Sequence, residues 1–219
     1  GRLASRLCAR RKGGTESRPI SGYHSSVTKG ATPENSSVVE ELPEGLRGDL
    51  VGKDLSQRDL SGLSFRGRDL SGALLVGASL AGADLRDTGL SGANLSSANL
   101  SGARLDGADL SGTDLTRCDL STARLDGAVL ERSVLSDTIM RGAQVQNASW
   151  NEAEIRGGDW TGVDLKGAGL HRVRVVDVNL RGACLDGAEI DDSDLIRVRL
   201  EEASLQGVRI IDTTLEDLD

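Results

Sequence analysis

An apolar residue recurs at every fifth position of this chain from Leu50 to Leu215, without a single insertion or deletion. Of these 34 positions, 25 hold leucine. The site two residues earlier is small, because all 29 such sites from Ala73 to Thr213 hold Ala, Thr, Ser, Cys, Gly or Val. The site two residues later is Gly in 18 of the 34 repeats. A repeat this regular has to be explained before any local element is assigned.

A period of five matches neither regular element. Five residues advance an α-helix by about 500°, so the leucines would wind around the axis and form no stripe. On a flat strand, an odd spacing would point successive leucines to opposite faces. The chain must therefore bend within every repeat, around a short extended piece in which Ala93 and Leu95 point the same way. The Gly, Asp or Asn residues that often follow favour a bend with permissive backbone angles.

Residues 48–217 resemble the pentapeptide-repeat family, whose pattern is A(D/N)LXX. Matching segments are Ala83-Asp84-Leu85, Ala93-Asn94-Leu95, Ala98-Asn99-Leu100 and Ala108-Asp109-Leu110. The resemblance implies an all-β fold, a right-handed quadrilateral β-helix with four pentapeptides per coil. It also implies that the leucine and the small residue point inward and the other three positions outward. The 34 repeats then make about 8.5 coils, and at about 4.8 Å per layer the rod is about 40 Å long.

Composition divides the chain into four parts. Residues 1–34 form a basic arm, 35–47 a short helical cap, 48–217 the β-helix and 218–219 a tail. The cap prediction rests on Ser37-Val38-Val39-Glu40, which has the spacing of a capping box. Pro43 should stop this helix by Leu42.

Two departures from the repeat predict local changes in the core. In the first coil, four sites that are small elsewhere hold larger side chains, and we expect the long basic ones to reach water past the open end. Further along, Trp150 and Trp160 replace leucine, and we expect two indoles on opposite sides of one widened coil. The four sites in the first coil are Lys53, Arg58, Leu63 and Arg68.

The first 30 residues contain seven basic residues and a single acid, Glu16, which favours an organelle-targeting presequence. We therefore expect an organellar protein, with the chloroplast preferred to the mitochondrion. A cytoplasmic location follows if the arm is no targeting signal. The alternative is a retained basic arm that docks on an acidic partner or on RNA. The candidate contact residues of the arm are Arg2, Arg6, Arg10, Arg11 and Lys12.

Enzyme chemistry finds little support in the sequence. The chain has only two His and three Cys, and His171 stands at an outward site with no Cys or Ser partner at an equivalent site. The glycines mark bends at period five, whereas a phosphate-binding loop would lie between a strand and a helix. We therefore expect no catalytic residue, no metal site and no cofactor. No run of 18 apolar residues predicts a transmembrane helix.

Outward charges are expected to form ladders, because residues 20 apart should stack on successive coils. Each exposed pair contributes only about 0 to 1 kcal/mol, so register and solubility are their expected roles. The three predicted ladders are Arg132, Glu152, Arg172 and Asp192; Glu154, Arg174 and Asp194; and Asp177 with Arg197.

Two surfaces are candidates for binding a protein partner. One is apolar and includes strand edges at the C-terminal coil, to which another chain could pair. The other is an acidic face. The apolar candidates are Val176, Ile196, Ile211 and Leu215, and the acidic candidates are Glu189, Asp191, Asp192 and Asp212.

The leading functional prediction is a non-enzymatic scaffold or accessory subunit of an organellar protein complex. It would bind a protein partner or a second copy through the C-terminal coil, and the rod itself would bind no nucleic acid. The alternative is mimicry of duplex DNA, by which some pentapeptide-repeat proteins inhibit or protect type II topoisomerases. Charge argues against it, because residues 48–217 carry 28 acids and 18 bases, a net charge of −10. A duplex of the same length carries roughly 24 phosphate charges.

Overall fold

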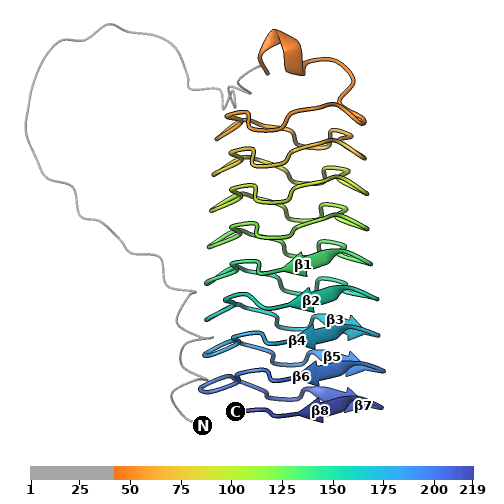
Figure 1. Cartoon of the computed structure of the whole chain (residues 1–219), viewed down its shortest axis with the longest axis vertical. Helices are drawn as coiled ribbons and strands as arrows, with labels where there is room; N and C mark the ends of the chain where they lie inside the picture. The colour runs from red at the N-terminus through yellow and green to blue at the C-terminus, as the bar shows by residue number, and fades with distance from the viewer. Residues whose placement is uncertain (1–41) are drawn as a thin grey trace, which may run out of the picture.

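The computed structural model describes residues 42–219, which form one stack of coils (Figure 1). Parallel β-bridges join residues 20 positions apart, from Asp54↔Leu74 to Cys184↔Ser204. A 20-residue offset over a five-residue repeat places four repeats in each coil. The all-β parallel solenoid predicted from the sequence is therefore confirmed, and its right-handed winding stays a prediction.

Regular strands begin at residue 134 and are three residues long. One side of the rod carries a five-stranded parallel sheet in the order β1-β2-β4-β6-β8, and another side carries β3-β5-β7. Isolated bridges continue the ladder over the earlier coils. The strands are β1 (Val134–Ser136), β2 (Glu154–Arg156), β3 (Gly169–His171), β4 (Arg174–Val176), β5 (Glu189–Asp191), β6 (Asp194–Ile196), β7 (Arg209–Ile211) and β8 (Thr214–Glu216).

Backbone hydrogen bonds run mostly along the rod axis. The Leu95 amide donates to Asp114 O of the next coil at 2.8 Å, and the Asn94 amide donates to Ala73 O of the previous coil at 3.0 Å. The Ala98 amide closes the bend on Leu95 O at 2.9 Å. Each coil therefore depends on its two neighbours for its hydrogen bonds, as expected for a solenoid.

The leucines and the small residues fill the bore of the rod. Leu100 and Ala103, for example, are both fully buried. Where a hydroxyl replaces Ala, a backbone carbonyl accepts from it: Thr88 Oγ1 donates to Phe65 O, 23 residues earlier, at 3.0 Å, and Ser133 Oγ donates to Leu130 O at 2.7 Å. An inward Thr or Ser therefore leaves no unpaired hydroxyl in the core. The link over 23 residues recurs at Thr113, Cys118, Thr138 and Ser193.

The two tryptophans meet inside the bore. Their ring centroids are 5.6 Å apart with a 40° tilt, and both side chains are buried. Gly158, two residues before Trp160, has a φ of +99°, and a Cβ there would overlap the carbonyl oxygen of Thr138. The chain beside the indoles thus approaches the previous coil so closely that only glycine fits.

The N-terminal cap differs from its prediction. Of the helix predicted within residues 37–42, residues 37–41 lie outside the described residues and Leu42 is not helical. The structure shows a 3-10 turn, η1 (Glu44–Leu46), that begins directly after Pro43. Two basic side chains of the first coil, Lys53 and Arg68, are partly exposed and also contact the cap. Lys53 Nζ donates to Gly45 O at 2.6 Å, and Arg68 donates to carbonyls of residues 46–48. The physical reason is that the end of a helical turn leaves carbonyl oxygens without backbone partners.

Candidate interaction surfaces

Many outward Asp and Asn residues hold the bend that follows them. Asp69 Oδ1 accepts a hydrogen bond from the Ser71 amide at 2.9 Å and another from the Ser71 hydroxyl. These bonds hold the pKa of Asp69 below its usual value, and the bond from the Ser71 hydroxyl contributes most to this shift. Asn94 accepts from the Ser96 amide at 2.9 Å in the same way. This side-chain turn explains why the repeat takes either Asp or Asn. The sequence analysis missed it, although the D-L-S spacing was the available signal.

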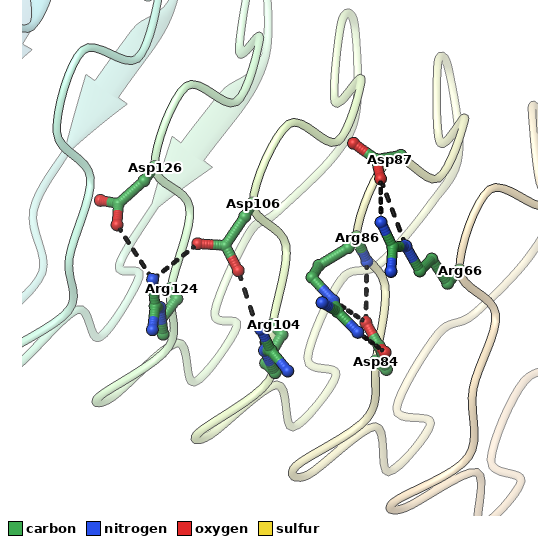
Figure 2. Close-up of polar contacts among 8 residues, drawn as sticks. All are labelled: Arg66, Asp84, Arg86, Asp87, Arg104, Asp106, Arg124 and Asp126. Carbon is green, nitrogen blue, oxygen red and sulfur yellow. Dashed lines mark hydrogen bonds and ion pairs between the residues drawn. The ribbon is translucent and has the colours of Figure 1, made fainter. Parts of the chain in front are cut away.

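Figure 2 shows a network of Arg–Asp contacts along one side of the rod. Asp84 accepts from Arg86 Nε at 2.7 Å, and this bond is the main reason that the pKa of Asp84 is lowered. Arg124 Nη2 lies 3.2 Å from Asp106 and 3.5 Å from Asp126. Bases and acids balance here, so this side presents no electropositive patch. The eight residues drawn are Arg66, Asp84, Arg86, Asp87, Arg104, Asp106, Arg124 and Asp126.

Parts of the predicted charge ladders form. Glu152 lies between Arg132 and Arg172, with N–O distances of 3.1 and 3.0 Å. Arg197 donates to both carboxylate oxygens of Asp177 at 2.6 and 2.9 Å. These bonds are the main reason that the pKa of Asp177 is lowered. Both groups link successive coils and so support the 20-residue register.

The remaining ladder contacts do not form within residues 42–219. Glu154, Arg174 and Asp194 are register partners in β2, β4 and β6, yet no ion pair joins them. Asp192 likewise makes no ion pair with Arg172, whose guanidinium lies on Glu152. Register places the Cα atoms, whereas the direction of a long outward side chain depends on its competing partners.

The predicted acidic face is partly neutralised. Glu189 accepts from Arg209 Nη1 at 2.8 Å, and Asp191 Oδ2 lies 3.8 Å from His171 Nδ1. Asp192 and Asp212 occupy bend positions of successive coils, with φ values of +51° and +46°. Of the four acids, Glu189 is therefore paired with an arginine, and the acidic face as a binding surface stays a prediction.

The predicted apolar surface is split between the two sheets. Val176 and Ile196 are register partners in β4 and β6, whereas Ile211 lies in β7 of the other sheet. Val176 is only 4% exposed, which corrects its prediction as a surface residue. Its two register partners, Arg156 and Ile196, have longer side chains that flank it on both sides. Ile196 is half-buried, and Ile211 and Leu215 are exposed.

Three further predictions concern the basic arm, a metal site and a transmembrane helix. The basic arm contacts, from Arg2 to Lys12, lie outside the described residues. Over residues 42–219, no three metal-ligating side chains gather into a group. No helix in that part of the chain is long and apolar enough to cross a membrane.

The chain is similar to known pentapeptide repeats. The family model described as pentapeptide repeats, in eight copies, matches residues 73–112, 84–121 and 113–149. No curated protein sequence matches the chain. Among solved structures, HetL, a pentapeptide repeat protein involved in heterocyst differentiation regulation in the cyanobacterium Nostoc, is 25% identical, with 78% of this chain and 86% of HetL covered and a TM-score of 0.31.

Two further structures are similar. QnrB1, a plasmid-mediated fluoroquinolone resistance protein, is 19% identical, with 74% of this chain and 89% of QnrB1 covered and a TM-score of 0.38. A pentapeptide repeat protein from the thylakoid lumen of Arabidopsis thaliana is 32% identical, with 46% of this chain and 66% of that protein covered and a TM-score of 0.28.

Proposed function

Because the chain belongs to the pentapeptide-repeat family, we propose that it is a non-enzymatic scaffold or accessory subunit of an organellar protein complex. Its inward side chains are packed in the core. Many of its outward carboxylates form hydrogen bonds within turns or ion pairs with basic side chains. Cys118 is buried in the bore, and this burial raises the pKa of its thiol to about 12. Such a thiol stays protonated and is a poor nucleophile. A rigid rod with this composition acts through its surface.

The observation that carries the proposal is a group of exposed apolar side chains in one coil. Leu205, Ile210, Ile211 and Leu215 are each between 42% and 48% exposed. Contiguous exposed apolar groups mark interaction sites, whereas isolated ones are ordinary. The same coil contains β7 and β8, which are the edge strands of their sheets. Among the described residues these two strands pair on one side only, and the other side suits a partner that adds a strand, either another protein or a second copy of the chain.

Charged substitutions on this coil test the proposal. We expect Ile211→Lys and Leu215→Lys in the full chain to abolish self-association of the protein, which light scattering measures. We also expect them to remove crosslinks between residues 205–215 and a partner protein from organelle extract. Leu74→Lys is the matched control, because Leu74 is 43% exposed on a distant coil. A wild-type chain that stays monomeric and forms no crosslink at residues 205–215 would refute this docking surface.

The organellar location rests on the basic composition of the first 30 residues. Import of the full chain into isolated chloroplasts and mitochondria, followed by determination of the N-terminal residue of the imported protein, tests it. Cleavage within residues 1–41 supports a targeting segment. Protein that stays outside both organelles contradicts it and leaves a retained arm, with a cytoplasmic location.

Topoisomerase inhibition by DNA mimicry ranks lower, because residues 48–217 carry a net charge of only −10 and Arg209 pairs with Glu189 on the acidic face. It predicts that micromolar protein inhibits supercoiling by DNA gyrase. It also predicts that combining Asp191→Asn, Asp192→Asn and Asp212→Asn weakens this inhibition. Wild-type protein without effect in that assay would eliminate the alternative.

A further inference from the structure

Two inward positions that hold small residues in later coils hold basic side chains in the first coil, and both side chains reach the cap. In this subsection the cap is residues 42–49. Lys53 Nζ donates to Gly45 O at 2.6 Å. Arg68 Nη2 lies 3.4 and 3.2 Å from the carbonyl oxygens of residues 46 and 47 and also donates to Gly48 O. One guanidinium thus gathers three successive carbonyl groups. From Ala73 onward the equivalent sites hold only small or β-branched residues, so this arrangement is specific to one end of the rod.

Backbone hydrogen bonds contribute little to holding this cap on the rod. The described bonds of the turn are internal: the Leu46 amide donates to Pro43 O at 2.7 Å and the Arg47 amide to Glu44 O at 3.4 Å. The first amide that donates to the next coil is that of Gly52, on Ser71 O at 2.9 Å. Besides the bond from the Val51 amide to the neighbouring Asp49 side chain, the side chains of Lys53 and Arg68 supply hydrogen bonds from the rod to the cap.

The cap also covers the apolar bore. Leu42 and Leu46 are buried in the same cluster as Leu50 and Phe65, the first inward residues of the rod. Figure 1 shows η1 lying across the end of the coil stack. If the cap moved away, this end of the bore would expose its leucines and unpaired strand edges, which invite association with other chains.

We propose that Lys53 and Arg68 form a latch that holds the cap as a plug over the bore, and that the plug opens as a unit while the coils stay folded. Charge-assisted bonds to several carbonyls are stronger than neutral ones, so two side chains suffice for a local element. Segments with few backbone bonds to the rest of a protein open independently of global unfolding. In the closed state, the plug keeps this end of the rod from pairing with other chains.

Hydrogen exchange of the full chain, followed by mass spectrometry, tests the latch. We expect Arg68→Ala to speed exchange of the Leu46 and Arg47 amides about tenfold and to leave the Leu95 amide unchanged. Arg58→Ala is the matched control, because Arg58 occupies an equivalent site but is exposed and makes no hydrogen bond to the cap among the described residues. Arg68→Lys should restore part of the protection.

Two results would overturn the proposal. The first is an Arg68→Ala variant whose cap amides exchange at the wild-type rate. The second is faster exchange that spreads equally to the middle of the rod, which would show that the cap is not a separate unit. If the variant does not fold, hydrogen exchange of the wild-type chain in low urea tests the proposal instead. Cap amides should then exchange by an opening that depends weakly on urea, and exchange only through global unfolding would contradict the latch.

Discussion

Replacing Gly158 with Ala adds one methyl group beside the two indoles. The added Cβ would overlap Thr138 O and lie 3.1 Å from Thr138 N, and both are backbone atoms that cannot rotate away. The Asp159 amide donates to the same Thr138 carbonyl at 3.2 Å, so moving the chain apart weakens that bond. A non-glycine residue at a φ of +99° costs about 1–3 kcal/mol. Loss of the hydrogen bond adds about 0.5–1.5 kcal/mol, so we expect Gly158→Ala to lower the free energy of unfolding by about 1.5–4.5 kcal/mol.

Gly112→Ala separates the overlap from the backbone angle. Gly112 has a φ of +64°, and a Cβ there meets nothing within 4 Å. The same bend position holds Arg117 and Thr122, both with a φ of +58°, so side chains fit this geometry. We therefore expect Gly112→Ala to cost only about 1 kcal/mol.

Urea unfolding followed by tryptophan emission and far-UV circular dichroism measures both variants. Trp150 and Trp160 are buried and should report directly on the coil that contains Gly158. Agreement of the two probes is needed before midpoints are converted into free energies, because repeat proteins can unfold in parts. Equal stability of the two variants would refute the reasoning.

Three further predictions concern the core and the turns. Leu100→Ala should lower the free energy of unfolding by about 2–5 kcal/mol, and Leu205→Ala by no more than about half of that because Leu205 is 48% exposed; similar losses in urea melts would contradict this. The hydrogen bonds from Ser71 lower the pKa of Asp69. The Asp69 carboxylate therefore stabilises the fold above the ordinary carboxyl pKa, and this stabilisation is lost as the pH falls through the lowered pKa. Asp69→Asn keeps the acceptor and should flatten the acid side of the stability curve between about pH 2 and 6, and an unchanged curve would argue against it. Cys118 should resist iodoacetamide in the folded chain and react in urea, because its thiol is buried with a pKa near 12; rapid native labelling, detected by mass spectrometry, would show that the bore opens.

The sequence analysis anticipated contacts that depend only on register. The pair Asp177 and Arg197 forms as predicted, because residues 20 apart stack on successive coils. The pair Glu154 and Arg174 is in the same register and does not form. Stacking is necessary for such a pair but does not decide the rotamers of two long side chains. The docking residues Ile211 and Leu215 stay predictions, as does the acidic face.

The sequence by itself determined which residues enter the bore, because a five-residue alternation of leucine and small side chains permits only one way of hiding them from water. Which of the side chains brought near one another actually bond was decided by the tertiary structure. Lys53 and Arg68 look like misfits in the repeat, and only the folded chain places them on the carbonyls of the cap. Likewise, Val176 sits at an outward position of the repeat, yet it is only 4% exposed in the folded chain, where its register partners Arg156 and Ile196 come from two other coils. Period is a local property of the chain, whereas partner choice depends on three-dimensional geometry.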